Sequence, residues 1–177
     1  MVLADLGCVI SDAILALFKT YGAAAGQISR AEGFSIHKYW LRRSPEKYGA
    51  IGRQRLSTGA FVRGWDYVNA QRERSRLVAA LAVTMRDFDV LVFPTAHEVA
   101  PLLATDKTLG GAFYNRVCNL TGSPTLSICI GFSDAGLPIA LQIIGRPFED
   151  PLVLRVGAWY ERVAGWRARR PALVRAA

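Results

Sequence analysis

The sequence predicts an α/β fold in which helical layers enclose a mixed β-sheet. Residues 89–94 are a short, continuously apolar run that ends at a proline, which is typical of a strand buried on both faces. A long helical pattern precedes this run, and two β-branched runs and a final helical pattern follow it. The hydrophobic fraction of 51% in 177 residues indicates a large buried core, and the length predicts a single one.

The N-terminal part of the chain is predicted to hold a short strand and two helices. Residues 6–10 form an apolar run that fits a strand, and residues 11–25 repeat apolar side chains at helical spacing. Residues 29–41 repeat that spacing and lead into a polar turn at residues 44–46. Pro45 lies where the first turn of a helix tolerates proline.

The longest helix is expected from about residue 64 to residue 88, because apolar side chains recur there at helical spacing. Its buried stripe is expected to consist of Trp65, Val68, Leu77, Val78, Leu81 and Met85. The middle of this helix, residues 71–76, is polar and is expected to be exposed or to face a site.

The C-terminal part is predicted to hold a β-hairpin and a helix. Two apolar, β-branched runs, residues 126–132 and 137–145, flank a Ser-Asp-Ala-Gly segment that suits a tight turn. The helix is expected to begin with Asp150 as its N-cap and a proline in its first turn, and to end at Gly165. The basic segment 166–177 is predicted to be a flexible tail.

Charge and hydropathy exclude several functional classes. The formal net charge of +8 comes mostly from arginines that are scattered along the chain without a basic stripe, so no nucleic-acid partner is expected. No run has the roughly 20 uninterrupted apolar residues of a membrane span, and the first residues lack the basic start of a signal peptide. A cytoplasmic protein without a membrane partner is therefore expected.

Few residues are candidates for independent chemistry. Cys8, Cys118 and Cys129 have no metal-binding spacing and are expected to be reduced and buried. His97 is a candidate acid, base or metal ligand, but an exposed histidine is the simpler interpretation because no third ligand has suitable spacing. A Cys118 nucleophile with His97 as base is the alternative, although its apolar neighbours indicate an inert thiol. His37 is expected to pack, and no metal or cofactor is expected.

A series of motifs runs in a fixed order along the chain. The motifs are Ala31–His37, Arg53–Gly59, Tyr67–Arg74, Asp89–Thr95, Asn119–Pro124, Gly131–Phe132 and Gly136–Phe148. In order and spacing they resemble the C-terminal part of amidase signature family hydrolases. The resemblance covers nearly all of the chain, so residues 1–177 are expected to form the C-terminal segment of an amidase domain, with the C-terminal part of the amidase signature fold.

The resemblance implies hydrolysis of an amide C–N bond in a small substrate through an acyl-enzyme. The family's serine nucleophile, cis-serine and lysine lie in the half that precedes this segment, and no run here resembles them. We therefore expect no catalytic residue, and a fragment of an amidase that is inactive alone. The alternative is a noncatalytic partner or scaffold that completes a separate signature-bearing chain. The expected protein partner is the missing N-terminal half or a second copy in a homodimer.

The resemblance also implies residues of the substrate pocket. The candidates are Arg55, Pro94, Thr95, Asn119 and Thr121. Arg55 resembles an arginine that contacts the substrate in glutamine-using amidotransferase relatives, and a solvated helix arginine is an equally weighted interpretation. The acidic residue that such relatives place seven positions before the Asn-Leu-Thr-Gly motif falls at Ala112, which argues against a glutamine-linked role.

Structural roles are the favoured interpretation for most of these candidates. Pro94 and Thr95 end a strand where the pocket should lie, while Asn119 and Thr121 are expected to hold a turn through hydrogen bonds from side chain to backbone. Arg74 resembles a recurrent arginine of the family and is expected to fix a contact between helix and loop rather than to touch substrate.

Overall fold

The computed structural model describes residues 2–15, 18–102 and 114–169. The chain divides into two compact units rather than the single core expected from its length. The sheet unit comprises Met1–Ile14, Ala82–Cys118 and Gly122–Ala177, and the helical unit comprises Leu15–Leu81 with Asn119–Thr121. Two units form because each has its own buried side chains, among them Ile143 in the sheet unit and Tyr21 in the helical unit.

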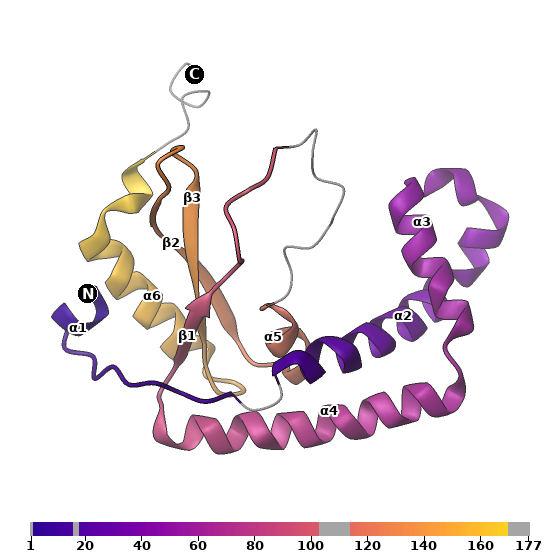
Figure 1. Cartoon of the computed structure of the whole chain (residues 1–177), viewed down its shortest axis with the longest axis horizontal. Coiled ribbons are helices and arrows are strands. Elements are labelled where there is room, and N and C mark those ends of the chain that lie inside the picture. The colour runs from indigo at the N-terminus through magenta and orange to yellow at the C-terminus, as the bar shows by residue number, and fades with distance from the viewer. Residues whose placement is uncertain (1, 16–17, 103–113, 170–177) are drawn as a thin grey trace. The chain divides into compact units, whose positions relative to one another are not determined.

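The sheet unit is built on three antiparallel strands in the order β1-β3-β2 (Figure 1). The strands are β1 Leu91–Pro94, β2 Thr125–Phe132 and β3 Pro138–Ile144. The predicted hairpin is confirmed: the Gly136 amide donates to the Ser133 carbonyl over 2.8 Å, and Gly136 has a φ of 75°. Glycine adopts this left-handed conformation without the steric cost that other residues meet.

β1 differs from the prediction of a strand buried on both faces. Leu91 is buried, but the side chain of Val92 is 39% exposed and Pro94 is exposed as well. Among the described residues β1 pairs only with β3, so it is an edge strand. An apolar sequence such as 89–94 favours a buried strand, but each face of the strand is buried only where another element covers it.

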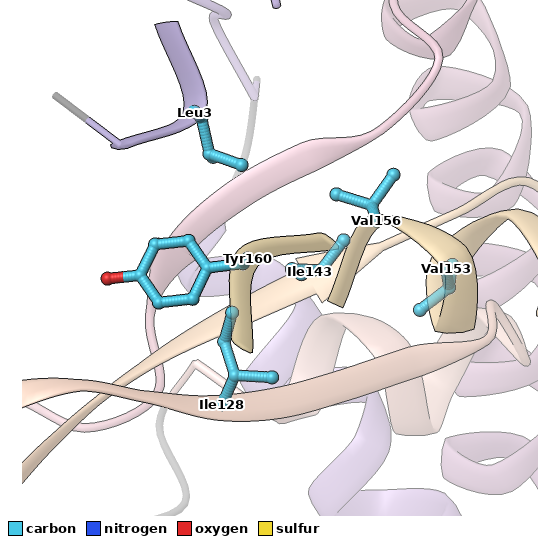
Figure 2. Packing of buried hydrophobic residues seen from close by; sticks show 6 residues of the cluster. All are labelled: Leu3, Ile128, Ile143, Val153, Val156 and Tyr160. Atoms are coloured by element: carbon cyan, nitrogen blue, oxygen red, sulfur yellow. The ribbon is translucent and has the colours of Figure 1, made fainter. Parts of the chain in front are cut away.

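Helix α6, Asp150–Ala164, packs along one face of the sheet (Figure 1). Its apolar stripe meets the strands in a core that also receives Leu3 from the short helix α1, Val2–Asp5 (Figure 2). The core residues are Leu3, Ile128, Ile143, Val153, Val156 and Tyr160. Gly157 lets α6 approach closely, because a Cβ at that position would overlap the side chain of Leu126.

The ends of α6 agree with the sequence in part. Pro151 lies in the first turn and Gly165 ends the helix with a φ of 69°, as predicted. The N-cap, however, is Glu149 rather than Asp150, which lies inside the first turn. A carboxylate in the first turn still stabilises the helix, since it faces the positive end of the helix dipole. Cap position is therefore one residue earlier than the local pattern indicated.

Arg146 ties the end of β3 to the segment that leads into β1. Its Nη2 donates to the carbonyls of Met85 and Phe88 over 2.9 and 2.7 Å, and its Nε donates to Met85 over 3.2 Å. A further ion pair joins Arg146 to Glu149 at 3.4 Å. One half-buried guanidinium thus satisfies carbonyls that a chain reversal leaves without helical partners.

The N-terminal strand predicted over residues 6–10 is absent from the described structure. Only α1 precedes this segment, and residues 8–15 carry no helix or strand. Val9 is 97% exposed. An apolar run becomes a strand only when a neighbouring strand accepts its backbone hydrogen bonds, and no described strand pairs with it.

The helical unit begins with one long helix instead of the two predicted. Helix α2 runs over Phe18–Arg43 without a break. Tyr21, Ala24 and Ile28 are buried at helical spacing on one face, and the residues between the two predicted helices include no proline that would stop the helix. The Tyr21 hydroxyl donates to the Leu77 carbonyl over 3.0 Å, and burial raises the pKa of this tyrosine.

Two further helices of this unit were not predicted. They are α3, Ala50–Ser57, and the 3₁₀ helix η2, Thr58–Phe61. Both follow a 3₁₀ turn over Pro45–Lys47, at the place of the polar turn predicted over residues 44–46. Gly59 brings η2 against α2: a Cβ there would overlap the Arg30 carbonyl oxygen and lie 2.5 Å from Cβ of Phe34. The glycine of the Arg53–Gly59 motif is therefore required for close packing.

The predicted long helix is confirmed as α4, Gly64–Thr84, which continues as a 3₁₀ turn over Met85–Asp87. Its predicted stripe is correct only in the C-terminal half. Leu77 and Leu81 are buried, as is Met85, whereas Trp65 and Val68 are 61% and 46% exposed. Periodicity identifies the apolar face of a helix but not what covers it.

The segment predicted as a flexible tail begins with ordered structure. Trp166–Ala168 form a 3₁₀ helix, and the Trp166 ring lies 5.8 Å from the ring of Phe132. The Arg169 guanidinium lies 3.9 Å above the same Phe132 ring, a cation–π contact. Trp166 and Arg169 therefore contact the hairpin, and residues 170–177 lie outside the described part of the chain.

Candidate functional site

The strand-end residues Pro94 and Thr95 lie where β1 leaves the sheet. The Thr95 amide donates to the Ala140 carbonyl over 3.0 Å, which extends the β1–β3 ladder by one bond. The Thr95 hydroxyl is 3.0 Å from the hydroxyl of Ser127 on β2, and either can donate. Thr95 is half-buried, and Pro94 and Ser127 are exposed.

The strand register places a polar row on the side of the sheet opposite α6. Gln142 of β3 faces Phe93 on β1 and Ser127 on β2. Directly opposed residues share a face and alternate residues take the other, so this row points away from the Ile128 and Ile143 side that α6 covers. We call the set Phe93, Thr95, Ser127 and Gln142 the polar face, after its three polar members.

Gln142 is an uncommon residue for the centre of a sheet. Its side chain is 2% exposed, and its Nε2 has no hydrogen-bond partner among the described residues. An unpaired buried donor of this kind costs about 1–3 kcal/mol. Sequence reasoning missed Gln142, although an amide within the otherwise apolar run 137–145 was the available signal.

Aromatic side chains lie beside the polar face. The Tyr114 ring is 5.9 Å from the Phe93 ring and 4.5 Å from the His97 imidazole. The Tyr114 hydroxyl and His97 Nδ1 are 3.1 Å apart, a hydrogen bond whose donor depends on the histidine tautomer. His97 is exposed, in agreement with the simpler of the two interpretations of the sequence, and its ring contacts that of Tyr114.

The structure gives Cys118 the properties of an inert thiol. Cys118 is 7% exposed and hydrogen-bonds to Thr125, and burial raises its pKa above the ordinary value of a thiol. A raised pKa lowers the thiolate fraction, so the pairing of a Cys118 nucleophile with His97 gains no support. Cys8 and Cys129 are half-buried rather than buried as predicted, and all three cysteines are free.

We expect Cys118 to react with iodoacetamide at least about tenfold more slowly than Cys8 in the folded chain at pH 7.5, because the Cys118 thiol is more buried and burial raises its pKa. Mass spectrometry of timed digests measures both rates in one sample. In urea the two rates should converge, since unfolding removes the difference in environment. Equal rates in the folded chain would contradict the buried, protonated Cys118.

The second pair of candidates, Asn119 and Thr121, lies on a short helix rather than in a turn. Helix α5, Arg116–Thr121, ends at Gly122, which has a φ of 77°. Arg74, which was predicted to fix a helix to a loop, contacts another helix: its Nε donates to the Leu120 carbonyl over 2.7 Å and so joins α4 to the end of α5. The side-chain hydrogen bonds expected of Asn119 and Thr121 stay a prediction.

Arg55 lies exposed on α3, in the helical unit. Its carbonyl accepts a 2.6 Å hydrogen bond from the Thr58 hydroxyl, which helps to join α3 to η2. The structure brings Pro94 and Thr95 together at one strand end, while Arg55, Asn119 and Thr121 belong to the helical unit. Their substrate-pocket role stays a prediction, and Ala112 lies outside the described residues.

The described residues show no sign of a metal centre or of a membrane-spanning helix. No group of three His, Cys, Asp or Glu side chains is placed to hold a metal ion within the part of the chain described. None of the described helices combines the length and the apolar character needed to cross a bilayer. His37, which was expected to pack, is half-buried and lies 3.0 Å from the Tyr48 hydroxyl through its Nδ1.

The resemblance to amidases implied an α/β fold with helical layers around a mixed sheet, and the described strands form a small antiparallel sheet with α6 on one face. The chain belongs to the amidase family, whose model, described as Amidase, matches residues 8–154. It is 36% identical over 159 residues to a glutamyl-tRNA(Gln) amidotransferase subunit of Chloroflexus aggregans and 35% identical over 154 residues to an amidase of Pseudomonas putida. These alignments cover 83% and 81% of the chain.

A solved structure described as an amidase superposes on 92% of this chain with a TM-score of 0.83 and 27% sequence identity. A bacterial aryl acylamidase of the amidase signature family shares the fold with a TM-score of 0.75 at 18% identity. The predicted fold class is thereby confirmed. The chain spans about a third of these curated relatives, 32% of the Chloroflexus protein and 33% of the Pseudomonas protein.

Proposed function

We propose that this chain is the C-terminal segment of an enzyme that hydrolyses amide C–N bonds through an acyl-enzyme. The family match over residues 8–154 carries the proposal, and the chain's span of about a third of its curated relatives supports the view that other segments complete the enzyme. Amide hydrolysis needs an activated nucleophile and donors for the developing oxyanion. In the proposal the catalytic serine, cis-serine and lysine come from outside this chain.

The contribution proposed for this segment is a wall of the substrate pocket. Pro94 and Thr95 end β1 beside the exposed Ser127 hydroxyl, and this strand end can present hydroxyl groups to a small amide. Arg55, Asn119 and Thr121 of the helical unit are proposed as pocket residues on the family resemblance alone, with Arg55 offering a guanidinium that can bind a carboxylate or carbonyl. Binding and chemistry would thus be divided between this segment and the rest of the enzyme.

The purified 177-residue chain should not hydrolyse amides above the uncatalysed rate, because it supplies no activated serine. Ammonia release from benzamide and propionamide measures this directly. The matched experiment expresses the reading frame extended upstream of the Met1 codon. The upstream part of this reading frame should encode a lysine and a Gly/Ser-rich stretch, and the extended protein should hydrolyse at least one amide.

Replacing the upstream serine nucleophile by alanine should lower the rate of the extended protein by a factor of about 10⁴ or more. The same protein with Ser75→Ala, an exposed hydroxyl on α4, should keep its rate. Hydrolysis by the 177-residue chain alone would contradict the proposal. An upstream sequence without the lysine and serines would remove its basis as well.

A second candidate is a noncatalytic partner or scaffold that completes a separate signature-bearing chain. Large apolar side chains exposed in the helical unit fit this candidate and the first one alike, because such surface is usually covered by a separate protein or by another segment of the same chain. They are Ile36, Tyr39, Trp40, Ile51, Phe61, Trp65 and Val68. Catalytic serine and lysine codons in a separate upstream gene would favour this candidate, whereas codons in frame with Met1 would favour the first. A second copy of the chain is the remaining proposed occupant.

We also propose a cytoplasmic location. The three cysteines are free, which fits a reducing compartment. Accessible-thiol labelling of intact and lysed cells tests this proposal, because a cytoplasmic chain is labelled by an impermeant reagent only after lysis. Labelling in intact cells would contradict it.

A further inference from the structure

Phe148, in the turn between β3 and α6, combines two unfavourable properties. Within residues 2–15, 18–102 and 114–169 it is the only residue other than glycine with a positive φ, which is 67°. A left-handed backbone is costly for a bulky residue that carries a Cβ. The side chain is also 95% exposed, so burial of the ring within this chain does not offset that cost. Such strain persists only where the surrounding structure holds it, and it often marks a functional position.

The residues on both sides hold Phe148 in place. On one side, the Arg146 guanidinium donates to the carbonyls of Met85 and Phe88 over 2.9 and 2.7 Å. On the other side, the Glu149 amide donates to the Arg146 carbonyl over 3.0 Å, and Glu149 is the N-cap of α6. A turn fixed at both ends therefore presents an aromatic ring to the outside.

The usual role of an apolar residue at this position does not apply to Phe148. The residue before an N-cap often packs on the fourth residue of the helix, a contact called a hydrophobic staple. With Glu149 as N-cap, the staple of α6 would join Phe148 to Val153. Val153 is 2% exposed and lies in the core of the sheet unit (Figure 2), whereas Phe148 is turned out to solvent. A partner that buries the ring must come from outside the described residues.

We propose that Phe148 is the anchor with which this chain docks on the upstream segment of the enzyme, the one that supplies the catalytic serines and lysine. The inference rests on the proposed function and deepens it, because it assigns a contact residue to that partner. The solved amidase that superposes on 92% of this chain is matched over only 39% of its own length. Most of that fold lies outside this chain, and it can supply a pocket for the ring.

Exposed apolar side chains accompany the anchor at the start of α6. Pro147 and Pro151 are exposed, and Leu154 is 59% exposed. Pro151 and Leu154 are three residues apart and so are neighbours on the surface of the helix. Aromatic anchors of interfaces fill well-packed pockets, and the contacts around them exclude water. The upstream segment should therefore offer Phe148 an apolar pocket with an apolar rim.

Hydroxyl-radical footprinting read by mass spectrometry measures the exposure of the Phe148 ring without a substitution. The 177-residue chain and the protein extended upstream of Met1 are oxidised side by side. Phe148 should be oxidised at least about tenfold more slowly in the extended protein, because an anchor is fully desolvated in its pocket. Tyr160, which is 6% exposed, is the control and should react slowly in both. Equal Phe148 rates would overturn the inference, as would protection that depends on the concentration of the 177-residue chain alone, which would identify a second copy.

Phe148→Asn separates the strain from the docking. Asparagine tolerates a left-handed backbone, so in the 177-residue chain this variant should shift the unfolding equilibrium about threefold toward the folded state. In the extended protein it should shift that equilibrium at least about tenfold toward the unfolded state, because the pocket loses its ring. Phe148→Leu should recover part of this loss. Urea unfolding measures all three variants and proteins.

A 177-residue chain destabilised by Phe148→Asn would give the ring a role within this chain and would overturn the inference. An extended protein whose stability is unchanged by Phe148→Asn would do the same. Ser75→Ala, on the exposed surface of α4, is the matched control and should change neither protein. Footprinting and unfolding do not depend on hydrolysis, so an extended protein without amidase activity would defeat the proposed function and still report whether Phe148 is covered.

Discussion

Gly59→Ala should lower the free energy of unfolding by about 3 kcal/mol or more, at the upper end of the range for an overpacked site. The added methyl group would overlap the Arg30 carbonyl oxygen and lie 2.5 Å from Cβ of Phe34. Both neighbours belong to α2, and a backbone carbonyl cannot turn aside as a flexible side chain can. We therefore expect η2 to move away from α2, with loss of packing in the helical unit.

Urea unfolding followed by circular dichroism measures this change, and Gly52→Ala is its matched control. Gly52 lies exposed on α3, and an added Cβ would meet no atom within 4 Å. Alanine is favoured over glycine inside a helix, so this variant should be more stable by about 0.5–1 kcal/mol. Equal unfolding midpoints for the two variants would contradict the close approach at Gly59.

Arg146→Ala should lower the free energy of unfolding by about 2–4 kcal/mol, because it removes a charged donor from two carbonyls and an ion pair. The carbonyls are those of Met85 and Phe88, at 2.9 and 2.7 Å from Nη2. Without the guanidinium these two carbonyls can hydrogen-bond only to water. The chain reversal that leads into β1 is then no longer hydrogen-bonded to the end of β3. Urea unfolding again provides the measurement.

Arg146→Lys should recover only part of the loss, because one ammonium group cannot reproduce the planar fork of the guanidinium. Arg155→Ala removes an exposed arginine of α6 whose guanidinium lies 5.7 Å from the Trp159 ring, and it should cost less than about 1 kcal/mol. If the lysine variant matched the wild type, or if Arg155→Ala cost as much as Arg146→Ala, the bridging role of Arg146 would be wrong.

Elements with strong local signals were predictable from the sequence. The hairpin follows from the turn chemistry at residues 133–136, and α6 follows from Pro151, Gly165 and an apolar stripe between them. The long α4 follows from its periodicity. Such signals depend on only a few neighbouring residues, so they can be recognised without knowing the tertiary contacts.

Predictions that depended on distant neighbours were the ones that failed. Residues 6–10 form no strand because no described strand pairs with them, and β1 is half exposed because it is an edge. The two expected N-terminal helices are one, since the residues between them, 26–28, include no proline and contribute the buried Ile28. These failures concern partners that lie far away in sequence, whereas the N-cap of α6 was misplaced by one residue within a local pattern.

The candidate site shows the same division. The order of the motifs alone determined the family, and it suggested the strand-end residues Pro94 and Thr95. Only the tertiary structure decided that Gln142 and Ser127 share their face, because the pairing register of β2, β3 and β1 is set by contacts between separate segments. Sequence periodicity assigns residues to alternating sides of a strand, but the position of α6 decides which side is the core and which carries the polar row.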